Sequence, residues 1–273
     1  MPPRLALIAG SGALVPEAIR AARDKGWEVA LFDVAGRADL AGENVTRLSF
    51  ADTRQMVATL RASGASHVCA VGAIELSDAQ RRSLMQFVGL VNGIGGIADR
   101  ILTATFAAAA KGRGIRIMGV DELLPQLVAP EGHFAGPADK VPPAARCAEA
   151  LRAARAVGAL DMGQAAVLSG DRIIAAEGIE RTDGLIARIA GYAASGLVDA
   201  TASNLILAKC LKPRQPRYLD MPAIGPDTVA GCAGAGISAI VVEAGGTLLI
   251  ERARLEALAS ERGVAIVGLK AKD

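Results

Sequence analysis

The sequence is poor in aromatic residues and has no excess of either charge. Only eight of its 273 residues are Phe, Trp or Tyr, and its 30 Lys and Arg residues are nearly balanced by 28 Asp and Glu residues. Nucleic acid binding draws on a strong positive field or on aromatic side chains that stack against bases. The composition therefore argues against a nucleic acid partner. By contrast, 52% of the residues are hydrophobic, which is ample for one or two buried cores.

Cysteine and histidine are also scarce, and their spacing excludes the common metal-binding motifs. The four cysteines, Cys69, Cys147, Cys210 and Cys232, are far apart and form no C-x-x-C pair. We predict that all four are reduced and mostly buried. His67 borders an apolar run, which favours a histidine at the edge of the core. Any metal ion would have to be held mainly by carboxylates.

Long uninterrupted hydrophobic runs are absent as well. No apolar stretch reaches the roughly 18 residues that a membrane-spanning helix needs. The apolar segment near the N-terminus is interrupted by glycines and is followed by Pro16 and Glu17, unlike a cleavable signal peptide. We therefore expect a cytoplasmic protein.

The first 124 residues alternate between short apolar runs and helical segments. This alternation is typical of a parallel sheet covered by crossover helices, so we predict a Rossmann-like α/β domain. Asp52 stands at the position of an N-cap, and a glycine follows each predicted helix. The predicted strands are 5–9, 29–34, 68–72 and 115–119, and the predicted helices are 17–25, 53–63 and 99–111.

A segment rich in proline and glycine separates this half from the rest. Between residues 126 and 143 these residues disrupt both helical and strand periodicity, which indicates a linker. We predict an α/β protein with two domains: a Rossmann-like parallel sheet over 1–128, a Pro/Gly-rich linker over 129–143, and a mixed α/β domain over 144–273. In the second domain the predicted helices are 144–157, 184–194, 228–235 and 252–262, and the predicted strands are 165–168, 172–176, 205–209, 237–242, 247–250 and 264–268.

The first candidate site is the turn Gly10-Ser11-Gly12, between a predicted strand and a predicted helix. Such a turn brings backbone N–H groups and a helix N-terminus close to an anion, so a nucleotide phosphate is a suitable ligand. Asp33, at the end of the next strand, is near the spacing of the acid that binds a ribose in dinucleotide folds. However, Val15 replaces the third glycine of that fingerprint. A tight turn without a ligand and a nicotinamide-dependent oxidoreductase both stand as alternatives.

A second candidate site follows the predicted hairpin of the C-terminal domain. Glu177 and Glu180 lie where a turn could direct both carboxylates at a hard cation such as Mg²⁺. The alternative is a solvated loop in which Thr182 or Asp183 caps the next helix.

The third candidate site is the segment 209–222, which combines prolines with several cations, among them Lys209, Lys212 and Arg217, and the acid Asp220. Cations at this density neutralise phosphoryl oxygens, and the acid can bind Mg²⁺ or orient water. We favour a phosphate or pyrophosphate site over a solvated basic loop, because prolines fix the backbone in a segment that no core requires.

Several motifs occur in a recognisable order. They are 8–16 (IAGSGALVP), 161–165 (DMGQA), 177–183 (EGIERTD), 212–215 (KPRQ) and 217–228 (RYLDMPAIGPDT). In this order they resemble the LpxI-type UDP-2,3-diacylglucosamine pyrophosphatases. The similarity covers nearly the whole chain and is strongest in its C-terminal half.

The resemblance implies two α/β-type domains, with the diacylated sugar phosphate between them, and Mg²⁺-dependent hydrolysis of a pyrophosphate. Water would attack the phosphorus on the sugar side, releasing UMP and 2,3-diacylglucosamine 1-phosphate (lipid X) for lipid A synthesis. Asp220 would be the catalytic carboxylate, either a metal ligand or a water-orienting group. The substrate-binding residues would be Gly10, Gly12, Gln164, Thr182, Asp183, Lys209, Lys212, Gln215, Arg217 and Thr228.

A lipid-linked nucleotide sugar as substrate also implies a peripheral, transient contact with the inner face of the inner membrane. The sequence is compatible with a homo-oligomer as well as with a monomer.

The chain departs from the family pattern at four places. The family's Gly-x-Val-x-Arg-Pro segment is replaced by 72–76 (GAIEL), and its Gly-Asp-Asp by 97–99 (IAD), where Ala98 takes the place of an acid. Arg181 replaces a glycine, and Pro216 replaces an acidic residue. A catalytically silent or altered-specificity paralogue that binds an acylated sugar phosphate is therefore a further alternative.

Overall fold

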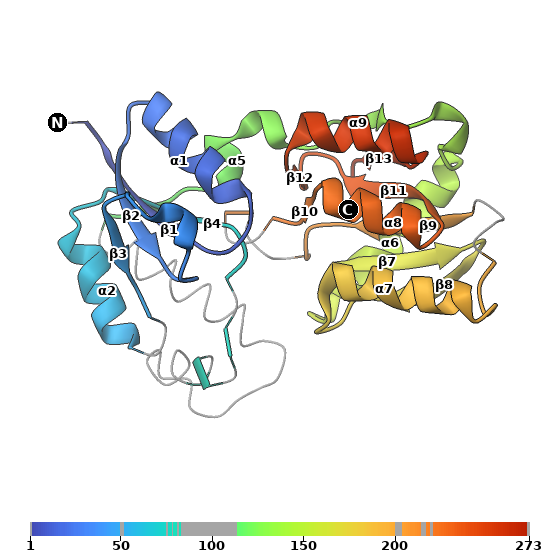
Figure 1. Ribbon diagram of the computed structural model, residues 1–273, viewed down its shortest axis with the longest axis horizontal. Coiled ribbons are helices and arrows are strands. Elements are labelled where there is room, and N and C mark those ends of the chain that lie inside the picture. The colour runs from blue at the N-terminus through green and yellow to red at the C-terminus, as the bar shows by residue number, and fades with distance from the viewer. Residues whose placement is uncertain are drawn as a thin grey trace. The chain divides into compact units, whose positions relative to one another are not determined.

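The computed structural model describes residues 2–49, 52–74, 76, 77, 79, 80, 82, 114–199, 204–213, 217, 218 and 221–271. The chain divides into two compact units, Met1–Pro125 and Gln126–Asp273 (Figure 1). Each unit is built on its own β-sheet.

The first unit contains a five-stranded sheet in which all neighbours run parallel, in the order β3-β2-β1-β4-β5. The central strand β1 is almost entirely buried, as expected for a strand with a helix on each face. The strands are β1 (Arg4–Ala9), β2 (Glu28–Asp33), β3 (Val45–Arg47), β4 (His67–Val71) and β5 (Arg116–Ile117).

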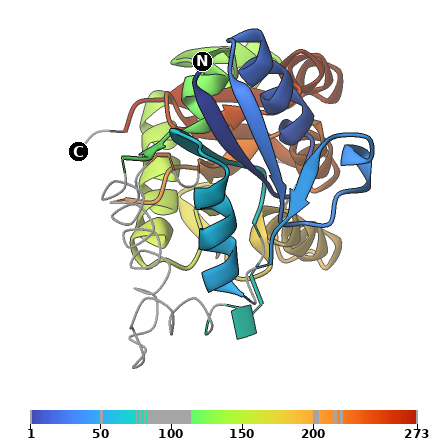
Figure 2. The same cartoon turned by 90° about the vertical axis from the view of Figure 1, so that its left-hand side faces the viewer.

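Two helices cover the opposite faces of this sheet (Figures 1 and 2). Helix α1 (Leu14–Asp24) packs against β1, β2 and β4, while α2 (Thr53–Ala62) places Met56 and Leu60 in a cluster with Ala6 and Ile8. Asp52 caps α2 as predicted, accepting the N–H of Gln55. The remaining described helices of the first unit are α5 (Val120–Leu123) and the 3-10 helices η1 (Ala38–Leu40) and η2 (Pro125–Leu127), and η2 extends into the second unit. The second unit has one described 3-10 helix, η3 (Ala138–Lys140).

The second unit contains a mixed six-stranded sheet in the order β6-β13-β11-β9-β7-β8. Its central strands β13, β11 and β9 are parallel, and β6, β7 and β8 pair in antiparallel fashion at the two sides. The strands are β6 (Gly132–Ala135), β7 (Ala165–Ser169), β8 (Arg172–Ala176), β9 (Leu205–Lys209), β11 (Ile237–Glu243) and β13 (Ala265–Leu269), and a small parallel pair is formed by β10 (Ala223–Ile224) and β12 (Leu248–Leu249).

The two faces of this sheet bury two separate hydrophobic cores. Alternate residues of β9 point to opposite faces, so that Leu205 and Leu207 belong to one core while Ile206 and Ala208 belong to the other. Three helices supply the first core and a single long helix supplies the second. The three are α7 (Arg181–Ala194), α8 (Pro226–Gly234) and α9 (Arg252–Arg262), and the single helix is α6 (Ala144–Ala159).

The predicted fold class is confirmed: the protein is α/β, with a parallel sheet in the first half and a mixed sheet in the second. Within the segment expected to be a linker, Gly132–Ala135 instead forms β6, which pairs with β13. The fourth predicted strand of the first half shortens to Arg116–Ile117. The helix predicted over 99–111 lies outside the described residues.

Candidate functional site

Three of the predicted substrate-binding residues, Gln164, Thr182 and Lys209, lie at one edge of the second sheet or contact a side chain there. Strand β9 ends at Lys209, and because β7 runs in the opposite direction, its first residue Ala165 pairs with Lys209. Gln164 therefore lies beside the carboxyl end of β9, and its carbonyl accepts the N–H of Cys210. Glu177, which follows β8, donates its N–H to Ala165 and so lies at the same edge. In open α/β sheets this is the edge at which ligands bind.

Glu177 is the central carboxylate of this edge and is only 5% exposed. Its Oε1 atom accepts a 2.7 Å hydrogen bond from the hydroxyl of Thr182, and its Oε2 atom accepts a 2.5 Å bond from the N–H of Gln164. Glu180 forms an ion pair of 2.8 Å with Arg188 instead. The two carboxylates expected to converge on a cation thus each have a partner within the protein.

The start of α7 also differs from the expected loop. The helix begins at Arg181 with Glu180 as its N-cap, so Thr182 and Asp183 lie inside the first turn and neither is the cap. Thr182 is buried and its hydroxyl donates to Glu177, whereas Asp183 is exposed. Arg181 adopts a φ of +63°, in the left-handed region that favours glycine. It is at this position that the chain departs from the glycine of the family motif.

Lys209 is a buried lysine, 8% exposed, at the carboxyl end of β9. Its Nζ atom donates a 2.8 Å hydrogen bond to the carbonyl of Ala223, the first residue of β10. Burial raises the pKa of the neighbouring Cys232 thiol, and the charge of Lys209 opposes this in part. Lys209 therefore carries positive charge into the interior of the unit, beside the edge described above.

Lys212 follows three residues after β9 and is paired with an acid. Its Nζ atom lies 2.7 Å from Oδ1 of Asp161, and both side chains are less than 20% exposed. Asp161 and Gln164 belong to the same motif, residues 161–165. The two predicted motifs at 161–165 and 212–215 are thus in direct contact.

Four predicted residues of this half remain, and the structure describes two of them, Thr228 and Arg217. Thr228 is buried in α8, where its hydroxyl accepts the N–H of Gly225 at 3.3 Å and so caps the helix. Arg217 is exposed. Gln215 and Asp220 lie outside the described residues.

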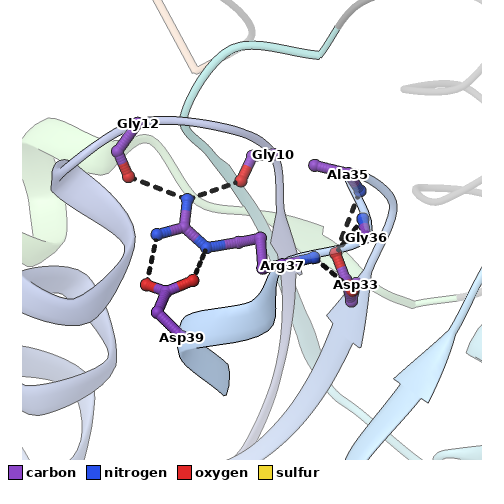
Figure 3. Close-up of polar contacts among 7 residues, drawn as sticks. All are labelled: Gly10, Gly12, Asp33, Ala35, Gly36, Arg37 and Asp39. Carbon is purple, nitrogen blue, oxygen red and sulfur yellow. Dashed lines mark hydrogen bonds and ion pairs between the residues drawn. The ribbon is translucent and has the colours of Figure 1, made fainter. Parts of the chain in front are cut away.

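The glycine turn of the first unit is closed by contacts within the protein (Figure 3). The N–H groups of Gly10 and Ser11 donate to the carbonyls of Val71 and Ala73, and Ala73 donates back to Ser11. The Nη1 atom of Arg37 donates to the carbonyls of Gly10 and Gly12, at 2.9 and 2.8 Å. The N–H groups of the first two residues of the turn are therefore already engaged.

Asp33 organises the loop that brings Arg37 to this turn. Its buried carboxylate accepts the N–H groups of Ala35, Gly36 and Arg37, each at 2.9 Å (Figure 3). The carboxylate that could have bound a ribose thus shapes its own loop instead. This arrangement removes the main support for a nicotinamide-dependent oxidoreductase.

Two residues of the second unit were not anticipated from the sequence. Glu243, the last residue of β11, accepts the N–H of Leu211 at 3.1 Å and lies 3.7 Å from the guanidinium of Arg155 on α6. An acid that ends an otherwise apolar strand is a usable signal, because strand ends of this kind carry functional side chains. Arg155 has no comparable signal, since arginines are common on exposed helix faces.

The four cysteines are free and buried, as predicted. Burial raises the pKa of Cys210 to about 12, with a further contribution from the charge of Glu243. This thiol lies beside the candidate site but stays protonated at neutral pH.

A metal ion held by protein side chains needs several ligands close together. Among the residues that the structure describes, no three His, Cys, Asp or Glu side chains come together closely enough to hold one. Mg²⁺ that is bound to a substrate phosphate needs only one or two carboxylates, which this observation leaves open.

None of the described helices is both long and apolar enough to span a membrane.

The fold and the site together define a class: an α/β protein of two sheet-based units, with buried cations and carboxylates at the carboxyl edge of its second sheet. Comparison with protein families narrows this class. The LpxI N-terminal domain matches residues 4–127 and the LpxI C-terminal domain matches residues 130–267. The chain belongs to the LpxI family.

One curated relative is similar over its whole length. It is the UDP-2,3-diacylglucosamine pyrophosphatase LpxI of Caulobacter vibrioides, which is 29% identical over 286 aligned positions covering 97% of each chain.

Proposed function

We propose that this protein hydrolyses the pyrophosphate of UDP-2,3-diacylglucosamine to UMP and 2,3-diacylglucosamine 1-phosphate. One observation carries the proposal: the similarity to a pyrophosphatase of that name extends across both units and 97% of both chains. The edge of the second sheet supports it, because Lys209 and Lys212 provide positive charge where a diphosphate would bind.

In the proposed reaction, the oxygen of a water molecule bonds to the phosphorus on the sugar side. The bond from that phosphorus to the bridging oxygen breaks, and UMP leaves with the bridging oxygen. Asp220 orients the attacking water or holds Mg²⁺, while Lys209, Lys212 and Arg217 stabilise the negative phosphoryl oxygens. The chemistry that bound Mg²⁺ supplies is further neutralisation of charge on these oxygens.

The other predicted residues bind the sugar and the nucleotide. Gln164, Thr182, Asp183, Gln215 and Thr228 shape the sugar-phosphate site. The turn at Gly10 and Gly12 contributes to the uridine nucleotide site, and it does so without the N–H groups of Gly10 and Ser11, which bond within the protein.

Because the proposed substrate carries acyl chains, the protein must also bind apolar groups that lie in a membrane. Leu160, Met162 and Ile179 are large aliphatic side chains that are more than half exposed, on segments that adjoin Asp161 and Thr182. Such side chains suit contact with acyl chains. We propose a cytoplasmic protein that meets its substrate at the inner face of the inner membrane by peripheral, transient contact.

The test is to incubate the purified protein with UDP-2,3-diacylglucosamine, in Mg²⁺ and separately in EDTA, and to measure UMP. We expect release of UMP in Mg²⁺ and its loss in EDTA. The Asp220→Ala variant should lose turnover and keep the thermal unfolding midpoint of the wild type. Asp171→Asn, which changes an exposed acid in the β7–β8 turn, is the matched control and should keep full activity.

Two outcomes would contradict the proposal. Binding of lipid X without release of UMP under any divalent metal would identify a silent paralogue. Equal hydrolysis of UDP-N-acetylglucosamine, which lacks the acyl chains, would identify a different substrate class.

A further inference from the structure

Asp161 lies two residues after the end of α6 and has a left-handed backbone. Its φ is +57°, and its N–H donates to the carbonyl of Gly158 at 3.1 Å as the helix ends. Glycine is the usual residue at this position. A carboxylate here also meets the negative end of the helix dipole. This unfavourable position for a carboxylate points to a role for the side chain beyond ending the helix.

That side chain holds Lys212. The Nζ to Oδ1 distance is 2.7 Å, the partners are 51 residues apart in the chain, and their side chains are 18% and 14% exposed. The Lys212 ammonium also brings positive charge to the end of α6, where the dipole favours it. An ammonium has three N–H donors, and the bond to Asp161 uses one of them.

Two further contacts fix the backbone around Lys212 against α6. A Cβ atom on Gly158 would lie 3.0 Å from Cδ of Pro213 and 3.3 Å from Cα of Lys212, so the last turn of the helix touches this segment directly. On the other side of Lys212, Glu243 accepts the N–H of Leu211 and lies 3.7 Å from Arg155 of α6. These contacts hold the backbone from Leu211 to Pro213 against α6. The ion pair with Asp161 then restrains the side chain of Lys212.

We propose that Asp161 is a positioning residue, which acts by orienting the Lys212 ammonium toward the diphosphate of the substrate. This inference rests on the proposed function, because it takes Lys212 as a phosphate ligand. Lysine side chains carry substantial rotamer entropy, so a lysine that is oriented beforehand binds a phosphate more tightly than a free one.

A double-mutant cycle tests this inference. The wild type, Asp161→Asn, Lys212→Met and the double variant are compared for the Kd of 2,3-diacylglucosamine 1-phosphate and for kcat and KM of UMP release. Asparagine suits the cycle because it tolerates the left-handed backbone and keeps the shape of aspartate. We expect Asp161→Asn to weaken binding about tenfold in the wild-type background and to have no effect in the Lys212→Met background. Equal effects of Asp161→Asn in both backgrounds would overturn the inference.

Two controls separate positioning from stability. Asp161→Gly relieves the backbone strain and should keep the thermal midpoint, while it weakens binding as much as Asp161→Asn does. Glu256→Gln removes an ion pair of 2.8 Å on α9 and should leave binding unchanged. Unchanged binding in Asp161→Gly would also overturn the inference.

The same measurements keep the two proposals apart. If the wild type binds lipid X but releases no UMP, the proposed function fails while the binding cycle still decides the role of Asp161. If the wild type neither binds nor turns over, both proposals are overturned.

Discussion

The hydroxyl of Thr182 donates a 2.7 Å hydrogen bond to Oε1 of Glu177, and both side chains are buried. Glu177 follows β8 and Thr182 lies in the first turn of α7, so this bond fastens the helix to the sheet. The other oxygen of the carboxylate accepts the N–H of Gln164, just before β7. One carboxylate at the end of β8 therefore holds both the start of β7 and the start of α7, through the predicted substrate-binding residues Gln164 and Thr182.

We expect Thr182→Val to destabilise the second unit and to raise KM for the substrate. Valine has the shape of threonine but leaves Oε1 of the buried Glu177 without this donor, which costs about 1–3 kcal/mol. Thermal unfolding and steady-state kinetics measure the two effects. Thr182→Ser keeps the hydroxyl and is the matched control, and a loss of equal size in Thr182→Ser would show that packing, not the hydrogen bond, matters at this position.

The parts of the fold that the sequence predicts are those whose apolar pattern is complete. Strands β1 and β9 are buried on both faces and are therefore continuous apolar runs. Strand β3 is short and largely exposed, and β6 is a four-residue edge strand between prolines and glycines, so neither has a periodic signal. Both form because a neighbouring strand offers hydrogen bonds, and this is tertiary information that a local pattern does not contain.

A second prediction concerns the close approach of two loops in the first unit. A Cβ atom on Gly10 would overlap the carbonyl oxygen of Ala73, which belongs to the loop after β4. We expect Gly10→Ala to lower the stability of this unit by about 1–3 kcal/mol, as over-packing does elsewhere. Gly191→Ala is the matched control: this residue lies within α7 with open space around its Cα, so alanine there should stabilise the protein slightly. The same loss in both variants, measured by chemical denaturation, would rule out the steric explanation.

The loop after β2 gives a third prediction. Asp33→Asn replaces one acceptor oxygen with an NH₂ group, which cannot accept the backbone N–H groups that the carboxylate now binds. We expect a loss of about 2 kcal/mol in the stability of the first unit. Asp39→Asn removes the exposed partner of Arg37 and should lower the stability much less than Asp33→Asn does. A larger effect in Asp39→Asn than in Asp33→Asn would contradict this assignment.

The candidate site was only partly accessible to sequence reasoning, and Asp33 and Asp161 show why. Residue type and spacing marked Asp33 as a ligand for a ribose, but three N–H groups two to four residues further on use its lone pairs. The contact between Asp161 and Lys212 joins residues 51 positions apart and depends on how α6 ends. Motifs therefore marked candidate segments, whereas the partner of each side chain could be identified only from the fold.

The fourth prediction is a loss of stability in mild acid that depends on His67. Partial burial, followed by the charge of Arg116, lowers the pKa of His67 below its usual value near 6.5, and the charge of Glu122 opposes this in part. As the pH falls through 6.5, the unfolded chain binds this proton before the folded protein does, so stability is present above this pH and is lost below it.

Thermal midpoints at pH 7.5 and pH 5.5 test this dependence. His67→Gln should lower the midpoint at both pH values, because the edge-to-face contact with Trp27 is lost, but should reduce the difference between them. An undiminished difference in the variant would assign the acid sensitivity to other groups.

The fifth prediction concerns the thiols. Burial raises the pKa of all four cysteines, to about 12 for Cys69 and Cys210. Since the thiolate is the nucleophile, a folded protein at pH 8 should react slowly with a disulfide reagent such as DTNB, and all four thiols should react once it is unfolded in guanidinium. Cys210→Ala should keep UMP release within about twofold of the wild type, because a thiol that stays protonated beside the site supplies no nucleophile. Rapid reaction of Cys210 in the folded protein, slowed by 2,3-diacylglucosamine 1-phosphate, would show instead that this end of β9 opens toward the ligand.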